Sequence, residues 1–282
     1  MGSDLAATIT KGSQSSFHYS FSFLPKEQRS ALNTVYAFCR TTDDIVDNEQ
    51  DKNRKAVLLR KWRIELGKAI KHESNYTLLN QLSVIAKKFN IPVQHFYELI
   101  RGVEMDLNKN RYETFEELRE YCYHVASSVG LMSIKIFGAS NDRALKYAEN
   151  LGIALQLTNI LRDIKTDAKY NRIYVPKEDL VKFGYSENDL FNSIYNLNFI
   201  NLMEFETKRA EEFFRLAQDS LRPEDKKFLF APKIMERIYY HTLLRIKANK
   251  YNVYTKSLKL PKFLQFLIAL KYLFKHRILK TV

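Results

Sequence analysis

The chain has 282 residues, of which 45% are hydrophobic and 27% are charged, a balance typical of globular rather than disordered proteins. Its two cysteines, Cys39 and Cys122, are too few for a disulfide framework or a multi-cysteine zinc site, and no apolar run reaches the about 18 residues that a membrane span needs. The formal net charge of +13 leaves nucleic acid, anionic lipid and phosphorylated substrates open as partners.

At the start of the chain, residues 1–16 are polar and lack the apolar core of a signal peptide. We therefore expect a cytoplasmic protein in which both cysteines are reduced core residues. The eight glycines and six prolines are a far smaller share than the roughly 12% of average composition. Apolar residues recur three or four positions apart over long stretches, and the period-two alternation of strands is absent. Since no linker divides the chain, the sequence predicts an all-α fold with a single domain over residues 1–282.

The first long helix is predicted over residues 26–48, and it carries a polar stripe. Tyr36, Arg40, Asp43 and Asp47 follow one another at i, i+4, i+7 and i+11, a spacing that places them on one face. The other faces are largely apolar, so we expect this helix to lie inside the fold. A buried carboxylate must then be paired or bind a metal ion, because leaving it unpaired costs several kcal/mol.

A second long helix, predicted over residues 145–168, repeats the pattern. Gln156, Asn159, Asp163 and Asp167 lie at i, i+3, i+7 and i+11 and again share one face. Its remaining positions are mainly leucine, isoleucine and alanine, so this helix is also expected inside the fold. One acidic stripe could be an ordinary solvated helix face. Two such stripes, each on a helix that is otherwise apolar, are harder to explain in that way.

Two interpretations of these stripes are open. In the first, they are buried ion networks in which Arg40 neutralises Asp43 and Asp47, and Arg162 neutralises the acids of the second helix. In the second, the two rows face each other and hold Mg²⁺, which takes six oxygen ligands and is bound by one or two carboxylates together with substrate phosphates. The second interpretation predicts a diphosphate held between the helices, with Arg40 and Arg162 on its outer oxygens.

The last third of the chain contains two further patterns. Ser186 followed by acidic residues predicts a helix start. From Tyr251 to Val282 the chain has seven lysines or arginines and no acidic residue, and residues 258–280 predict an amphipathic helix. One side of that helix has the apolar residues Phe263, Phe266, Leu267, Leu270 and Phe274. Core packing and peripheral contact with the inner face of an anionic membrane are both open for this side.

Both aspartate-rich segments resemble those of a known family. Asp43–Asp47 (DDIVD) and Asn159–Asp167 (NILRDIKTD) resemble the two aspartate-rich motifs of the squalene/phytoene synthase family. Three further segments are similar to other parts of that family, namely Ser15–Phe17 (SSF), Tyr121–Gly130 (YCYHVASSVG) and Arg172–Pro176 (RIYVP). Within the family, Arg101–Leu107 and Tyr251–Tyr254 most resemble the bacterial hopanoid-pathway enzymes that make presqualene diphosphate.

The resemblance implies an isoprenoid (terpenoid) synthase fold, which is a single helical bundle with a central cavity. It implies a Mg²⁺-dependent prenyltransferase that joins two prenyl diphosphate substrates through their first carbons. On overall likeness we expect farnesyl diphosphate as the substrate and presqualene diphosphate as the product. A bulky Phe21 favours this shorter substrate, whereas the small Asn33 favours geranylgeranyl diphosphate.

Several alternatives remain open. One is phytoene synthase, another is dehydrosqualene synthase, and a third continues to squalene with a hydride from NADPH. NADPH is not expected for the first step, and the chain has no Gly-x-Gly-x-x-Gly motif. A non-catalytic helical assembly factor is a further alternative, but both aspartate motifs are intact. Nucleic acid is not expected as a partner, because the acidic stripes would repel phosphate in the absence of metal.

Carried over residue by residue, the resemblance implies three groups of site residues. The metal ligands are expected to be Asp43, Asp47, Asp163 and Asp167. The residues at the reacting centre and the leaving diphosphate are expected to be Tyr36, Arg40, Tyr121 and Arg162. The other substrate contacts are expected to be Ser16, Phe17, Phe21, Val125, Gln156, Asn159, Arg172, Tyr239 and Lys256. At Lys256 relatives often have arginine, so the charge is kept there but bidentate contact is not.

Overall fold

The computed structural model describes residues 21, 24–47, 49, 51–139, 141–222, 225 and 229–281, with side chains up to residue 273. Within these ranges the regular elements are helices and none is a strand, so the predicted all-α class is confirmed. The helices are α3 (Lys26–Asp47), α4 (Lys52–Ala69), α5 (Thr77–Lys88), α6 (Gln94–Asn108), α7 (Phe115–Cys122), the π-helical segment η1 (Tyr123–Ser127), α8 (Ser128–Ile136), α9 (Asp142–Lys169), α10 (Lys177–Lys182), α11 (Glu187–Phe191), α12 (Leu197–Asp219), α13 (Phe230–Ala248) and α14 (Lys262–Thr281).

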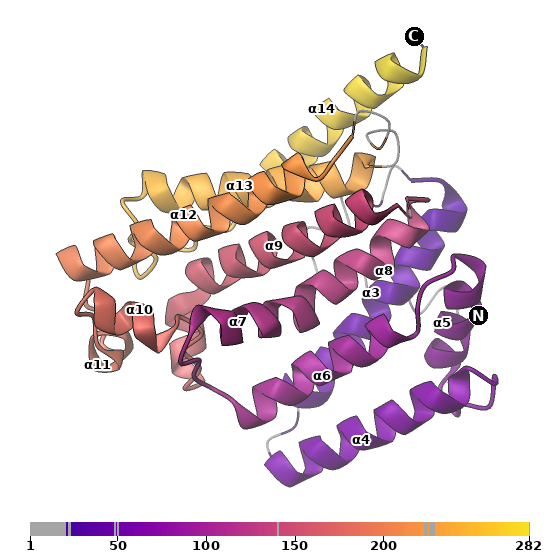
Figure 1. The fold of residues 1–282 in the computed structure, drawn as a ribbon, viewed down its shortest axis with the longest axis horizontal. Helices are drawn as coiled ribbons and strands as arrows, with labels where there is room; N and C mark the ends of the chain where they lie inside the picture. Colours follow the sequence, from indigo (N-terminus) through magenta and orange to yellow (C-terminus); the bar gives the residue numbers. More distant parts are fainter. Residues whose placement is uncertain are drawn as a thin grey trace.

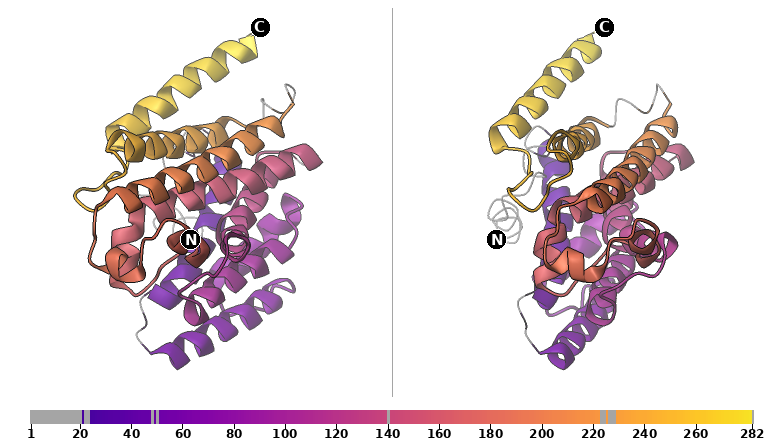
Figure 2. Two further views of the ribbon diagram at one scale, coloured as in Figure 1. Left: turned by 60° about the vertical axis from the view of Figure 1, so that its left-hand side comes forward. Right: turned by 90° about the vertical axis from the view of Figure 1, so that its left-hand side faces the viewer.

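The two helices with acidic stripes lie at the centre of the bundle. Helix α9 packs against α8, η1, α12 and α13, while α3 packs against α4, α5, α6 and α8. Figure 1 shows α4, α6, the row of α7 and α8, α9 and α12 in succession, with α3 crossing behind α6 and α8. Helix α14 projects beyond the other helices in both views of Figure 2. The interior positions of α3 and α9 therefore follow from their mainly apolar sequences, as predicted.

The backbones of η1 and α8 approach α9 very closely, and two glycines permit this. A Cβ on Gly152 of α9 would lie 2.5 Å from the Cα of Ser127, and a Cβ on Gly130 would lie 2.7 Å from the carbonyl oxygen of Ala148. Real Cβ atoms do not come this close to backbone, so both positions require glycine. The close packing brings Val125 of η1 beside Gln156 of α9, and both side chains line the cavity described below.

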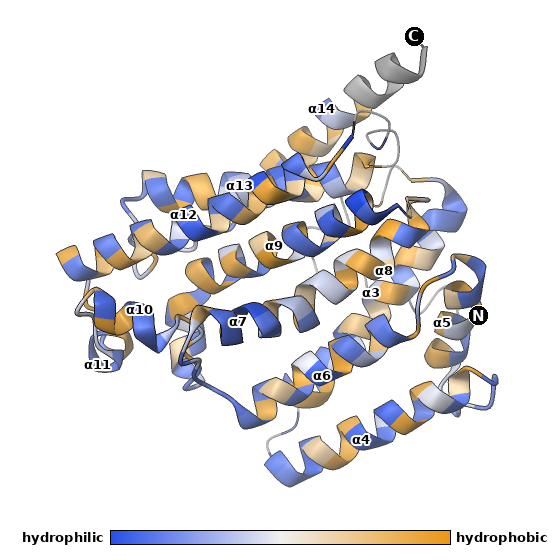
Figure 3. Cartoon of the chain, viewed as in Figure 1, coloured by the Kyte–Doolittle hydropathy of each residue, from blue (hydrophilic) through white to orange (hydrophobic). Residues whose placement is uncertain are grey.

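Helix boundaries follow local sequence signals closely. The helix predicted over residues 26–48 is observed at Lys26–Asp47, and the one predicted over 145–168 is observed at Asp142–Lys169. The second helix begins earlier because the Asn141 side chain accepts a hydrogen bond from the Ala144 backbone N–H. The start predicted at Ser186 is confirmed, since Ser186 and Asp189 form a reciprocal capping box. Figure 3 shows that the residues of α7 are mainly hydrophilic (blue).

Both cysteines are free and buried, as expected for core thiols. The C-terminal amphipathic helix also forms, and it begins just after Pro261 rather than at residue 258. Core packing is the wrong interpretation for three of its apolar residues, because Phe263, Phe266 and Leu267 are exposed. In the part of the chain that the structure describes, none of the helices is long and apolar enough to cross a membrane.

Candidate active site

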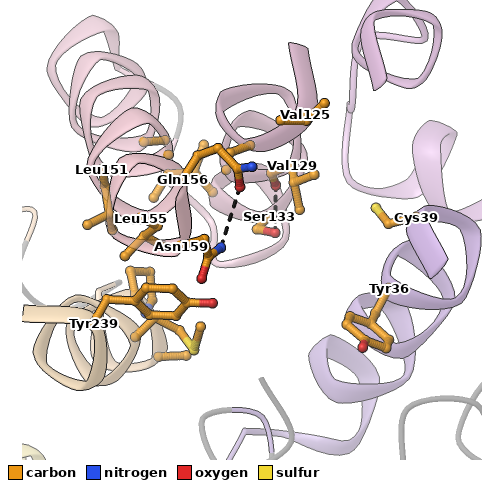
Figure 4. A pocket seen from close by; sticks show the side chains of 18 of the residues that line it. Tyr36, Cys39, Val125, Val129, Ser133, Leu151, Leu155, Gln156, Asn159 and Tyr239 are labelled. Atoms are coloured by element: carbon orange, nitrogen blue, oxygen red, sulfur yellow. Dashed lines mark hydrogen bonds between the residues drawn. The ribbon is translucent and has the colours of Figure 1, made fainter. Parts of the chain in front are cut away.

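An apolar cavity lies between α3, η1, α8, α9 and α13. It contains about 1190 Å³ of empty space, part of it open to solvent. Its walls include Val129, Phe137, Leu151, Leu155 and Met235. Figure 4 shows Tyr36 and Cys39 of α3 across the cavity from Asn159 and Tyr239. The predicted central cavity is therefore present, and the two striped helices face each other across it.

The walls of this cavity change from apolar to polar along each striped helix. On α9 the lining runs from Ala148, Leu151 and Leu155 to Gln156 and Asn159. On α3, the corresponding polar residues are Arg40 and Asp43, which lie toward the end of the helix. The polar side chains thus gather where the carboxyl-terminal halves of α3 and α9 meet.

A second cavity, rich in carboxylates, adjoins the first at this polar end. It contains about 640 Å³ of empty space, and its lining includes the acids Asp43, Asp47 and Asp106. Asp43, Val125 and Gln156 line both cavities. An apolar chamber therefore opens directly beside an acidic one.

The acidic rows carry an electrostatic cost in the absence of cations. Burial, together with the neighbouring Asp47 carboxylate, raises the pKa of Asp43 to about 7, although Arg40 opposes the shift. Burial and Asp163 likewise raise the pKa of Asp167 to about 7. The ionised forms of these acids are disfavoured because two carboxylates one turn apart are partly removed from water. A divalent cation placed between them would remove that cost.

Comparison with known proteins identifies the family. The Squalene/phytoene synthase family model matches residues 10–264. The chain belongs to the squalene/phytoene synthase family. It is 35% identical over 267 residues to a protein named 15-cis-phytoene synthase from Synechococcus elongatus, covering 90% of this chain and 86% of that one. It is 32% identical over 271 residues to a phytoene synthase from Arthrospira platensis, covering 92% and 88%.

Solved structures agree with this assignment. A crystal structure of a dehydrosqualene synthase superimposes with a TM-score of 0.84 and 29% identity, covering 99% of this chain and 97% of that one. The squalene synthase HpnC from Alicyclobacillus acidocaldarius superimposes with a TM-score of 0.81 and 28% identity, covering 89% and 94%. The isoprenoid synthase fold is thus confirmed, and the chain is a prenyltransferase-type member of a family that acts on prenyl diphosphates. The hopanoid-pathway type is not singled out, since the sequence relatives are named phytoene synthases.

The arginines of the squalene/phytoene synthase site are paired with carboxylates in this structure. Arg40 lies 2.6 Å from Asp44 and not in an ion pair with Asp43 or Asp47, so the first ion network proposed from the sequence is wrong in its pairing. Arg162 pairs with Asp163, as that interpretation predicted for the second helix. Neither pairing neutralises both acids of its row, because Asp43 and Asp167 keep raised pKa values.

Arg172 connects the two rows. It follows the end of α9, and its backbone N–H donates to the carbonyl of Asp167. Its Nη1 lies 3.9 Å from the Oδ1 of Asp47 at the end of α3, and it also lines the acidic cavity. The predicted substrate contact at Arg172 is therefore placed between the two acidic motifs, where a diphosphate oxygen could replace the loose contact with Asp47.

Sequence reasoning missed Asp106 on α6. Its carboxylate accepts hydrogen bonds from the hydroxyls of Tyr121 and Tyr174, both at 3.0 Å, and the two tyrosine rings stack with centroids 5.1 Å apart. Asp106 lines the acidic cavity and raises the pKa of both Asp43 and Asp167. The sequence does contain a signal for Asp106. It lies four and three positions after Gly102 and Val103, which are buried, so it is on the same face of α6 as these two residues.

Tyr121 is held as a neutral phenol in this arrangement. Burial, followed by the nearby Asp106 carboxylate, raises the pKa of Tyr121 well above its usual range. Burial raises the pKa of Tyr239 as well, and the adjacent Arg162 guanidinium opposes that shift. Both side chains are therefore neutral phenols at neutral pH, and the hydroxyl of Tyr121 donates to Asp106.

The donor set fits magnesium held jointly with a substrate. The Oδ1 atom of Asn159 is buried without a hydrogen-bond partner, and it lies one turn from Asp163 on α9. Among the residues that the structure describes, no group of three or more histidine, cysteine, aspartate or glutamate side chains forms a ready-made metal cluster. Magnesium uses one or two carboxylates with substrate oxygens and waters, so the pairs on α3 and α9 with Asn159 offer suitable ligands.

Of the predicted site residues, most line the two cavities. Those on the apolar cavity are Phe21, Tyr36, Arg40, Asp43, Val125, Gln156, Asn159 and Tyr239, and the acidic cavity adds Asp47, Tyr121 and Arg172. Four of the predicted residues that the structure describes line neither cavity, namely Arg162, Asp163, Asp167 and Lys256. Asp167 lines a smaller neighbouring cavity with Arg172 and Tyr174, and Lys256 is exposed in the segment between α13 and α14. Ser16 and Phe17 lie outside the described residues, so the contacts expected of them stay predictions.

Proposed function

We propose that this chain is a Mg²⁺-dependent synthase that joins two molecules of geranylgeranyl diphosphate through their first carbons and forms phytoene. The observation that carries this proposal is the junction at Asp43, Val125 and Gln156, where the apolar cavity opens beside the acidic one. A prenyl diphosphate has the matching composition, with a long hydrocarbon chain joined to a highly charged head. The head would lie at the polar ends of α3 and α9 and the chains in the apolar cavity.

The residues at the polar end would prepare the diphosphate to leave. Asp43 and Asp47 on one helix, with Asp163 and Asp167 on the other, would hold Mg²⁺, which supplies charge neutralisation to the leaving group. Arg40 and Arg162 would exchange their present carboxylate partners for diphosphate oxygens, to which guanidinium binds bidentately.

The apolar walls would protect the cation formed when the first diphosphate leaves. The double bond of the second substrate attacks this allylic cation, and loss of one proton closes a cyclopropane. A second ionisation with loss of another proton gives phytoene, so two diphosphates and two protons leave and no reductant is needed. The buried walls around Phe21, Phe137 and Leu151 would keep away the water that would otherwise trap the cation as an alcohol.

The released diphosphate is the best candidate for the proton acceptor. Tyr121 is poorly suited, because burial keeps it a neutral phenol and its hydroxyl already donates to Asp106. The role that we assign to Tyr121 is to orient Asp106 and the polar end of the site. Tyr36 and Tyr239 lie on opposite walls of the apolar cavity, where they would flank the reacting carbons.

Two observations favour prenyl substrates of different lengths. The phytoene synthases from Synechococcus elongatus and Arthrospira platensis, at 35% and 32% identity over most of the chain, favour geranylgeranyl diphosphate. The second candidate is a farnesyl-using enzyme that forms presqualene diphosphate. It is favoured by Phe21, which is only 5% exposed and takes up room in the cavity wall.

The deciding experiment is product analysis. Purified protein is incubated with labelled geranylgeranyl or farnesyl diphosphate, with and without Mg²⁺ and with and without NADPH. We expect phytoene from geranylgeranyl diphosphate, only with Mg²⁺ and independently of NADPH. Preferred conversion of farnesyl diphosphate to presqualene diphosphate would favour the second candidate, and no condensation of either substrate would contradict both.

A further inference from the structure

The exposed side of α14 is apolar, which is the reverse of an ordinary surface helix. Phe263 is 68% exposed, Phe266 42%, Leu267 40% and Leu264 38%. A helix on the surface of a globular protein normally turns its apolar stripe toward the core. Helix α14 instead presents two phenylalanines and two leucines to the outside.

The inward side of α14 is already used for packing. Gln265 and Ala269 are buried, and the Gln265 side chain donates to the carbonyl of Leu260 at 2.7 Å. Tyr272 is tied to α13, since its hydroxyl accepts a hydrogen bond from Arg237 Nε at 3.0 Å. The buried Ala269 and the Tyr272 bond to α13 hold this side of the helix against the bundle, so the apolar side cannot turn inward without breaking these contacts.

The charge of the segment indicates what would cover this side. From Tyr251 to Val282 there are seven basic residues and no acidic residue. Lys259, just before α14, and Lys271, on α14, are exposed. A second copy of the chain would bring two such segments together and they would repel each other. A nucleic acid would use the lysines and leave the apolar side in water. An anionic bilayer surface matches both the charge and the apolar side.

We propose that α14 docks this protein on an anionic lipid bilayer, with Phe263, Phe266 and Leu267 in the acyl-chain boundary and the lysines at the lipid phosphates. The helix would lie in the plane of the interface, because it projects beyond the bundle with its apolar side free (Figure 2). Such an arrangement is peripheral and reversible.

Docking through α14 would bring the apolar cavity close to the lipid. Helix α13 packs against α14, and α13 also supplies Ala231, Met235 and Tyr239 to the cavity wall. If the proposed function holds, this places a wall of the reaction chamber one helix away from the phase in which polyisoprenoid products dissolve. The docking itself does not depend on that function and is testable without substrate.

The test is vesicle flotation with the full chain. Vesicles of phosphatidylcholine alone are compared with vesicles that also contain phosphatidylglycerol. We expect binding to the anionic vesicles that falls steeply with salt, as electrostatic attraction requires. The variant Lys259→Gln/Lys271→Gln should bind about 25-fold more weakly, at about fivefold per charge. Its control is Lys52→Gln/Lys61→Gln on α4, at the far side of the bundle (Figure 1).

The apolar side is tested with Phe263→Ser/Phe266→Ser/Leu267→Ser. This variant should lose about tenfold or more in vesicle binding, because partitioning scales with buried apolar area. The matched control is Val57→Ser/Leu58→Ser/Ile64→Ser, which removes three exposed apolar residues of α4 and should bind as the parent does. Turnover of soluble substrate should be unchanged in the α14 variant, so failure of docking and failure of the proposed function are separate results.

Three outcomes would overturn the proposal. Failure of the parent protein to bind anionic vesicles would contradict the proposal directly. A parent dimer that becomes a monomer in the α14 variant, without vesicle binding, would identify a second copy as the occupant. A melting temperature that falls in the α14 variant far more than in its α4 control, again without vesicle binding, would show that another part of the chain covers this side.

Discussion

The exchange Asp43→Asn should stabilise the Mg²⁺-free protein while strongly lowering its activity. The pKa of Asp43 is raised to about 7 in the folded state, compared with about 3.9 in an unfolded chain. A raised acid pKa means that stability is complete below about pH 4 and is lost as pH rises toward 7. Three pH units correspond to ~4 kcal/mol, and since part of the shift comes from Asp47, we expect a recovery on the order of 2–4 kcal/mol at pH 8.

Thermal melts without Mg²⁺ at pH 5 and pH 8 measure this effect. At pH 8 the variant should melt several degrees above the parent, since 1 kcal/mol shifts the melting temperature by about 2–4 °C in a chain of this size. At pH 5 the difference should be much smaller. Turnover should fall by about 10²–10³-fold, the usual loss when one electrostatic contact to a developing charge is removed.

The matched control is Asp44→Asn on the same helix. Asp44 pairs with the partly exposed Arg40, and losing such a pair costs about 0–1 kcal/mol. This variant should therefore be neutral or slightly less stable at pH 8. An Asp43→Asn protein that is destabilised at pH 8, or that retains full activity, would refute the reasoning.

The remaining predictions concern packing, pH and substrate length. Gly152→Ala should lower the free energy of unfolding, measured by chemical denaturation, by about 3 kcal/mol or more, because its Cβ would clash with the backbone of Ser127. In the control Gly67→Ala the Cβ would meet only a tyrosine hydroxyl at 3.3 Å, so the free energy of unfolding should stay the same or rise by up to about 1 kcal/mol. Equal losses in the two variants would contradict the packing account. Hydrogen bonds from Lys68, Ser74 and a backbone N–H lower the pKa of Glu65 to about 2, so the parent should lose stability as pH falls from about 4.3 toward 2. Denaturation of Glu65→Gln should lack that acid loss, and an unchanged pH profile would count against the assignment. Phe21→Leu should shift the ratio of geranylgeranyl to farnesyl turnover by about tenfold toward the longer substrate, and an unchanged ratio would mean that Phe21 does not limit chain length.

Much of the site was predictable because it follows helical periodicity. The i, i+3, i+4 and i+7 spacings fix which side chains share a face, so the stripes through Asp43 and Asn159 could be located before any fold was known. Their burial could be predicted too, since the remaining faces of both helices are apolar. Individual ion pairs could not be predicted, because the Arg40 side-chain rotamer decides that it pairs with Asp44. Sequence spacing does not determine that rotamer.

Contacts between segments that are distant in the sequence were less accessible. Asp106 belongs to the site only because α6 brings it beside Tyr121 and Tyr174, which are 15 and 68 positions away. The exposure of Phe263 and its neighbours was equally open, since an amphipathic pattern defines two faces without saying which one packs. In α14 the buried Gln265 and Ala269 and the hydrogen bond between Tyr272 and Arg237 of α13 show which face packs.

The central claim is that the acidic rows of α3 and α9 converge on one diphosphate at the mouth of an apolar cavity. Crystals grown with Mn²⁺ in place of Mg²⁺ and an unreactive prenyl thiodiphosphate test it most directly, because the anomalous signal locates the metal. The account predicts manganese peaks beside carboxylates of both rows, at Asp43 or Asp47 on α3 and at Asp163 or Asp167 on α9. The thiodiphosphate should lie between the two rows, with the prenyl chain beside Leu151 and Leu155. Manganese bound to one row alone, or a prenyl chain outside the cavity, would contradict it.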